Sequence, residues 1–295
     1  ARRRLLDRAA RLGAQIELGV LGVGDRPGLF PAELVGTHDV DQHIVLVDLG
    51  VGPGVLFAAQ VVGATPMDRP EWGAVNPKNG EIYFSLTNSD AANRHPAKVD
   101  AANPRAYSDS DGKKTSGNPN GHIIRFHEQG GRSSAMQFQW DIFLFGAEED
   151  QREANLSGLT ANNDFSSPDG LWFSKASGIC WIQTDDGAMT DETNCMMLAA
   201  IPGQVGDGGK ITVNNKMTVL GQEQTSQQQT FIGAALGEAK LRRFLVAPKG
   251  AEVTGVTETA DGKTLFVKLL SLGEADDEGR RDGEVHLGRD LGAGQ

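Results

Sequence analysis

Short apolar runs, rich in β-branched and aromatic residues, recur along the chain between residues 81 and 270. Each run is bounded by Gly, Asn, Asp or Pro, which favour tight turns. The runs lie at residues 81–88, 121–128, 136–145, 179–185, 210–221, 241–248 and 264–270. Runs of this length with such boundaries are typical of antiparallel strands joined by hairpins. The pattern therefore predicts an all-β fold for this part of the chain.

The ends of the chain, and one internal stretch, depart from this pattern. Residues 1–60 open with a basic amphipathic stretch that predicts a short helix, followed by apolar, glycine-containing runs that predict strands of uncertain register. Residues 89–120 are polar and rich in turn residues, which predicts a long surface loop. Residues 276–295 have no apolar period and predict a flexible tail. The strand-rich region is expected to span residues 61–275.

Three segments of this region share one layout, and they begin at Glu71, Asp169 and Glu252. In each segment an acidic residue starts a short apolar strand. A glycine-containing turn follows, with the glycine 9, 9 and 10 positions after the acidic residue, and a second strand leaves the turn. The chain therefore contains one hairpin repeated three times, and internal repeats of strands are typical of propellers.

The spacing of the repeat predicts how the acidic residues are arranged. The intervals between them are 98 and 83 positions, about twice the ~40–50 residues of a propeller blade. On this reasoning every second blade begins its inner strand with a carboxylate. The inner strands of a β-propeller line a central channel, so the three carboxylates are expected to converge there.

Converging carboxylates repel one another, and a hard cation with a preference for charged oxygen ligands relieves that repulsion. Without a cation, their pKa values would have to rise. We therefore predict that Glu71, Asp169 and Glu252 are metal ligands. Each residue taken alone has a simpler interpretation, since Asp-Gly at 169–170 is a common turn pair and Glu252 suits an exposed strand end.

Arg69 stands two residues before Glu71, and alternate side chains of an extended stretch point the same way. Its guanidinium would then face the same channel, where it is suited to grip a phosphate or carboxylate of a substrate. The alternative is that Arg69 neutralises Glu71 or Asp68.

Charge and composition narrow the possible partners. The net charge of −11 disfavours nucleic acid and anionic membranes as main partners. No window approaches the roughly 20 consecutive apolar residues of a membrane span. Asp7, Arg8 and Arg11 interrupt the apolar stretch that an export signal requires, so any such signal is expected to precede this sequence.

The cysteines and the absence of three common catalytic or nucleotide-binding motifs limit the kinds of reaction that the sequence predicts. Cys180 and Cys195 lack CxxC spacing and lie in apolar runs, so buried free thiols are expected, with a disulfide between neighbouring strands as the alternative. The sequence has no nucleophile elbow, P-loop or dinucleotide fingerprint.

Between about residues 58 and 275 the chain resembles the PhoX-type alkaline phosphatases, a bacterial family of exported, metal-dependent phosphomonoesterases built as a six-bladed β-propeller. The motifs that carry the resemblance are GATPMDRPEWGAVNPKNGEIYFSLTN, NPNGHIIRF, FQWDIFLFG, SPDGLWF, WIQTD and RRFLVAPKGAEVTGVTETADGKTLFV. The resemblance implies calcium and iron ions at the channel mouth, with Glu71, Asp169 and Glu252 at acidic ligand positions and Arg69 at a phosphate-binding position. It also implies hydrolysis of phosphomonoesters to inorganic phosphate, a periplasmic or secreted location, and a monomer.

The sequence departs from the family upstream of the motifs. The family has there a cysteine and a segment like TPWGT followed by Cys-Glu-Glu, which supply iron ligands, and residues 1–60 contain nothing comparable. Cys180 and Cys195 do not lie at that position. The chain thus resembles the C-terminal part of the fold, with about four of its six blades. Two alternative functions are a truncated propeller that binds calcium without turnover, and a calcium-dependent lactonase or esterase propeller.

Overall fold

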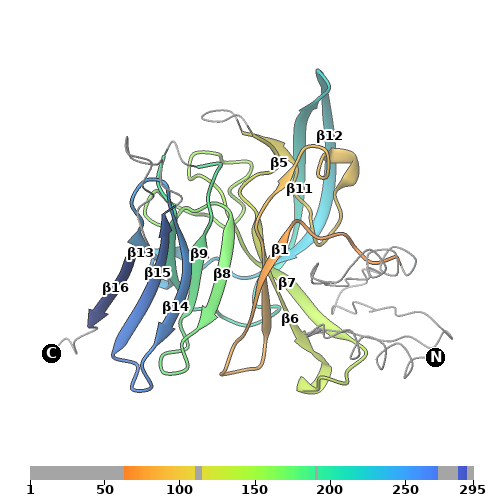
Figure 1. Ribbon diagram of the computed structural model, residues 1–295. Helices are drawn as coiled ribbons and strands as arrows, with labels where there is room; N and C mark the ends of the chain where they lie inside the picture. The colour runs from red at the N-terminus through yellow and green to blue at the C-terminus, as the bar shows by residue number, and fades with distance from the viewer. Residues whose placement is uncertain (1–62, 110–114, 190–191, 272–284, 291–295) are drawn as a thin grey trace, which may run out of the picture.

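The computed structural model of the protein describes residues 63–109, 115–189, 192–271 and 285–290, and nearly all of its regular structure is β-strand (Figure 1). The predicted all-β fold is confirmed. The predicted N-terminal segment of residues 1–60 lies outside the described residues.

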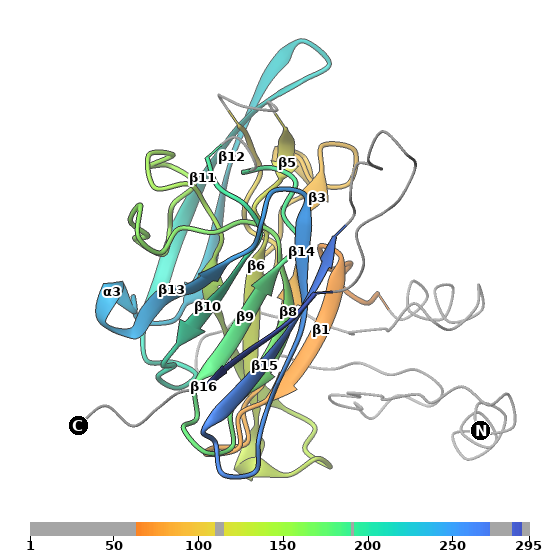
Figure 2. The same ribbon diagram turned by 60° about the vertical axis from the view of Figure 1, so that its left-hand side comes forward.

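The strands form three sheets, which the two ribbon views show side by side (Figures 1 and 2). In spatial order, the first sheet contains β1 (Pro70–Val75), β2 (Ile82–Leu86), β6 (His122–Glu128), β7 (Phe138–Phe145), β12 (Gln222–Ile232), β11 (Gly209–Val219), β4 (Tyr107–Ser108), β5 (Ser116–Asn118) and β3 (Ser89–Asp90). The second contains β8 (Pro168–Phe173), β9 (Cys180–Thr184), β10 (Met196–Ala200) and β13 (Leu241–Val246). The third contains β14 (Ala251–Glu258), β15 (Thr264–Ser271) and β16 (Val285–Asp290).

The described helices are single short turns. They are η1 (Pro96–Lys98), η2 (Gln129–Gly131) and α3 (Gly237–Lys240). In the described parts of the chain, no helix has the length and the apolar character that crossing a bilayer demands.

Each sheet is built as a propeller blade whose inner strand begins one of the three sequence repeats. The inner strands are β1, β8 and β14; β1 contacts β8, and β8 contacts β14. The repeats therefore lie on neighbouring blades, and the expectation that they occupy every second blade is wrong. The described residues form three blades, and the ring that these blades make is open. The expected number of about four blades for the whole chain stays a prediction.

Insertions within the blades explain the long intervals between the repeats. The short strands β3 to β5 lie between β2 and β6 in the chain, and the β11–β12 hairpin lies between β10 and β13. This hairpin leaves the second blade, joins the first sheet through β7, and projects above the sheets at the top of Figure 1.

The core fills the spaces between the blades. Because successive side chains of a strand point to opposite faces, one strand contributes to two clusters. On β9, Cys180 and Ile182 pack against the first sheet, whereas Trp181 packs against the third sheet beside Val253 and Val267. These contacts hold the inner strands at fixed positions relative to one another.

The described residues of the stretch 89–120, expected to be a surface loop, instead include three short strands of the first sheet and pack against it. Ala101 and Ala102 are buried in the cluster on the outer face of this sheet. Arg105 is also buried, and its guanidinium donates to Asn118 Oδ1 and to the carbonyl oxygens of residues 121 and 154. The prediction failed because several polar side chains of this stretch are buried and bind one another and the backbone, which its composition does not reveal.

The predicted C-terminal tail includes a strand, because β16 pairs antiparallel with β15. The predicted limits of the propeller region, residues 61–275, stay a prediction. The two cysteines are buried and free, as expected from their apolar surroundings.

Candidate metal centre

The three repeat carboxylates follow the same backbone feature at the start of each inner strand. Two residues before each carboxylate, the chain adopts a positive φ: 43° at Arg69, 50° at Ser167 and 76° at Gly250. Positive φ is uncommon for residues other than glycine, so its recurrence at three equivalent places indicates a common local geometry. This geometry brings the chain into each inner strand in the same way.

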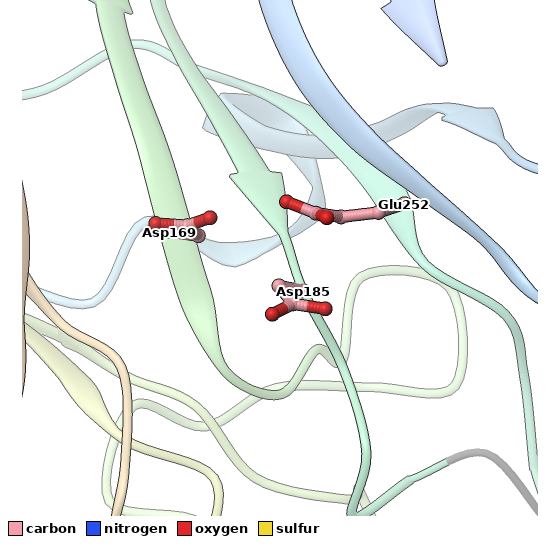
Figure 3. A group of neighbouring side chains, drawn as sticks. All are labelled: Asp169, Asp185 and Glu252. Atoms are coloured by element: carbon pink, nitrogen blue, oxygen red, sulfur yellow. The ribbon is translucent and has the colours of Figure 1, made fainter. Parts of the chain in front are cut away.

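Three carboxylates come together where the second and third blades meet. Asp169 lies on β8, Asp185 directly follows β9, and Glu252 lies on β14. One carboxylate oxygen from each residue lies within 4.8 Å of those of the other two. Figure 3 shows the three side chains pointing toward one another from their separate segments. The structure thus brings together two of the three predicted ligands, Asp169 and Glu252, and adds Asp185.

A backbone hydrogen bond positions Asp185, and an equivalent hydrogen bond occurs in the first blade. The Asp185 N–H donates to the carbonyl of Ser167 at 3.2 Å, and the Thr87 N–H donates to the carbonyl of Arg69 at 3.0 Å. Thr87 and Asp185 stand at equivalent places in the first two repeats, 16 positions after Glu71 and Asp169 respectively. Sequence reasoning missed Asp185 because it compared only the acidic residue that begins each repeat, and the equivalent place in the first repeat holds Thr87 rather than an acid.

The proximity of the carboxylates raises two of their pKa values. Burial, followed by the charges of Glu71 and Asp185, raises the pKa of Asp169 to about 6. Burial, followed by the charges of Asp185 and Asp169, raises the pKa of Glu252 to about 7. The Oδ1 atom of Asp169 is buried and accepts no hydrogen bond from the described residues.

Glu71 and Arg69 lie beside this group and are more exposed. Glu71 is not one of the three mutually close carboxylates, but its charge contributes to the raised pKa of Asp169 and of Glu252. Arg69 Nη2 lies 3.3 Å from Glu71 Oε1, and Arg69 Nη1 donates to Asn88 Oδ1 at 2.9 Å. Asp68 pairs with Arg94 instead. The neutralisation of Glu71 by Arg69, considered from the sequence, therefore occurs in the fold.

Comparison with known protein families identifies one whose model matches most of this chain. The model of the alkaline phosphatase PhoX family matches residues 42–273. The chain belongs to this family. The match includes all three inner strands and every residue of the acidic group.

A solved structure of a PhoX protein is also similar to this chain. The fold is similar to that of Pseudomonas fluorescens PhoX in complex with vanadate, described as a transition state analogue, with 29% sequence identity and a TM-score of 0.53. The alignment covers 78% of this chain and 35% of the Pseudomonas chain, so this PhoX-family chain spans about a third of that relative's length. No curated protein matches the chain.

The two cysteines of this PhoX-family chain lie in different surroundings. Cys195 accepts a hydrogen bond from the Asp186 N–H at 3.2 Å, and burial raises the pKa of its thiol to about 11, with smaller contributions from the charges of Asp185 and Glu252. Burial also raises the pKa of Cys180, which packs between the first two blades. Both thiols are therefore protonated at neutral pH.

Proposed function

We propose that Asp169, Asp185 and Glu252 bind a metal cation and that the protein hydrolyses phosphomonoesters at this site, releasing inorganic phosphate. The observation that supports the proposal most directly is the convergence of three carboxylates from two neighbouring blades within 4.8 Å. Such a group is unfavourable when fully ionised, and a bound cation would offset the repulsion. Membership in the PhoX family supports the choice of phosphate esters as substrates.

The residues present suit a hard cation. All three groups offer carboxylate oxygens, the ligands that calcium prefers and that ferric iron also accepts. The buried Oδ1 of Asp169 has no hydrogen-bond donor among the described residues and is available as a ligand. We propose calcium and iron as the ions, with Glu71 as a further ligand or as a charge that strengthens binding. When bound, such ions would polarise the phosphoryl oxygens of a substrate.

Arg69 is the candidate phosphate-binding residue. Its side chain is 58% exposed and lies beside Glu71 at the edge of the acidic group. A guanidinium has five N–H donors, and the bonds to Asn88 and Glu71 use two of them. The others are available to the equatorial oxygens of a phosphoryl group, whose charge Arg69 would stabilise.

A direct test combines metal analysis with turnover. The purified, dialysed protein is analysed for calcium and iron and assayed with a chromogenic phosphomonoester, with and without chelator. Asp185→Asn and Glu252→Gln should lower both metal content and turnover, whereas Asp150→Asn, an exposed acidic residue elsewhere, should change neither. Turnover that survives chelation and both site variants would exclude the proposed site.

A second candidate function is cation binding without catalysis. It is favoured by the open ring of the three described blades. It predicts chelator-sensitive metal binding with no release of phosphate. The same experiment separates the two candidates, because they agree on metal content and differ on turnover.

The location and partners that we propose follow from the family. An exported, periplasmic or secreted protein that acts as a monomer on small phosphate esters agrees with the acidic charge of the chain. Fractionation of the native host and light scattering of the purified protein test the location and the monomeric state.

A further inference from the structure

Asn88 lies half-buried between the first and second blades, one residue after the first repeat segment ends. Its side chain contacts the residues that immediately precede two inner strands. Asn88 Oδ1 accepts a hydrogen bond from Arg69 Nη1 at 2.9 Å, and Asn88 Nδ2 lies 3.4 Å from Ser167 Oγ. One planar amide therefore links the start of β1 to the start of β8.

The chemistry of the partners fixes the orientation of this amide. A guanidinium can only donate, so the atom that faces Arg69 must be the amide oxygen. The amide nitrogen is then directed to Ser167 Oγ, which can accept. The contact to Ser167 is weak but agrees with this orientation, in which the amide oxygen is directed at Arg69.

We propose that Asn88 is a positioning residue that holds the guanidinium of Arg69 in place for binding a phosphate group, an inference that rests on the proposed function of Arg69. Without Asn88, the guanidinium would keep, among the described residues, only the contact to Glu71 at 3.3 Å, between side chains that are 58% and 37% exposed. Exposed ion pairs of this kind restrain long side chains weakly. A neutral acceptor also restrains Arg69 without cancelling its charge, which an additional carboxylate would do.

The first measurement is the affinity for inorganic phosphate, determined by titration calorimetry on the calcium-loaded protein. Asn88→Ala should weaken phosphate binding about tenfold, as expected for the loss of a hydrogen bond to a charged group. Asn214→Ala, an exposed asparagine on β11 that bonds only to Gln227 among the described residues, should leave the affinity within about twofold.

A double-mutant cycle separates positioning from a general structural effect. In an Arg69→Met background, Asn88→Ala should change the phosphate affinity by less than about twofold, because the group it positions is gone. If Asn88→Ala weakens binding equally in both backgrounds, or in neither, the proposal is wrong.

A second readout does not depend on phosphate binding. The rotation of the Arg69 guanidinium about its Nε–Cζ bond can be followed by NMR, with the signals assigned through Arg69→Met. Rotation should be slow in the wild type, faster in Asn88→Ala, and slow again in Asn88→Asp, which keeps the acceptor oxygen. If the wild type binds no phosphate, the proposed function of Arg69 fails, whereas unchanged rotation in Asn88→Ala shows that Asn88 does not hold Arg69.

Discussion

Asp169 and Glu252 stand on neighbouring blades, and a carboxylate oxygen of one lies within 4.8 Å of a carboxylate oxygen of the other. Two carboxylates this close repel each other when both are ionised, which favours the retention of a proton by the pair. Their raised pKa values, about 6 and about 7, describe a pair that holds this proton well above the usual range of carboxylic acids. A bound cation would take the place of the proton, so metal binding and proton release should be coupled.

The metal-free protein should therefore become less stable as the pH rises. The ordinary pKa values are 3.8 for Asp169 and 4.5 for Glu252, and both rise on folding. Between about pH 4 and pH 7 the folded state binds more protons than the unfolded state, so the contribution of the pair is present below this window and lost through it. The measurement is the Tm in chelator from pH 4.5 to pH 7.5. Glu252→Gln should reduce the fall in Tm, and an equal fall in this variant would contradict the prediction.

Calcium should restore the stability that the metal-free protein loses at neutral pH. A ligand that binds only the folded state adds about 2.7 kcal/mol to the free energy of unfolding when it is present at a hundredfold excess over its Kd. Thermal unfolding at pH 7.5 over a calcium titration should show a rising Tm in the wild type and in Asp150→Asn. Asp185→Asn should lose most of the increase. A full increase in Asp185→Asn would show that calcium binds elsewhere.

Ser167 should tolerate glycine and reject a β-branched residue. Its φ of 50° lies in the left-handed region, and its side chain is fully buried. Ser167→Gly relieves the backbone conformation and loses weak hydroxyl contacts, so the free energy of unfolding should change by less than about 1 kcal/mol. Ser167→Val should cost about 2–3 kcal/mol, because a β-branched side chain is strongly disfavoured at this φ. Urea unfolding measures both, and equal stabilities would argue against this conformation.

Removing one partner of the buried ion pair between Arg125 and Asp141 should lower the free energy of unfolding. Arg125 Nε donates to Asp141 Oδ1 at 2.6 Å, and its Nη2 donates to Asp207 Oδ1 at 2.7 Å. Arg125→Met would leave the buried Asp141 uncompensated, at a cost of about 3–5 kcal/mol. Arg125→Met combined with Asp141→Leu should recover part of this loss in urea unfolding. A single variant as stable as the wild type would show that the pair contributes little.

The hairpin repeat can be recognised in the sequence because it is local. The acidic residue, the turn glycine and the alternating apolar positions all lie within one hairpin, where spacing determines geometry. This is why the sequence alone predicts that Asp169 and Glu252 lie near each other. The family resemblance, carried by motifs in the same hairpins, is confirmed by the family match over residues 42–273.

The features that sequence reasoning missed depend on contacts between distant segments. The long interval between Glu71 and Asp169 in the sequence suggested that another blade lies between their two blades. Insertions within the first blade account for this interval instead. No local sequence pattern distinguishes such an insertion from a blade. Asp185 looked like the end of an ordinary strand, and only the packing of β9 beside β8 and β14 brings it to the acidic group. The burial of Arg105 likewise depends on acceptors from residues 118, 121 and 154.

The β11–β12 hairpin has a consequence for how the protein folds. It is inserted in the second blade but pairs with strands of the first, through Ile232 with Ile142 and through Lys216 with Tyr107. The first sheet therefore cannot be completed during synthesis until residues 209–232 have emerged, after much of the second blade has already been made. Because the first sheet is completed by a segment inserted in the second blade, the two are expected to fold and unfold as one cooperative unit rather than as separable modules.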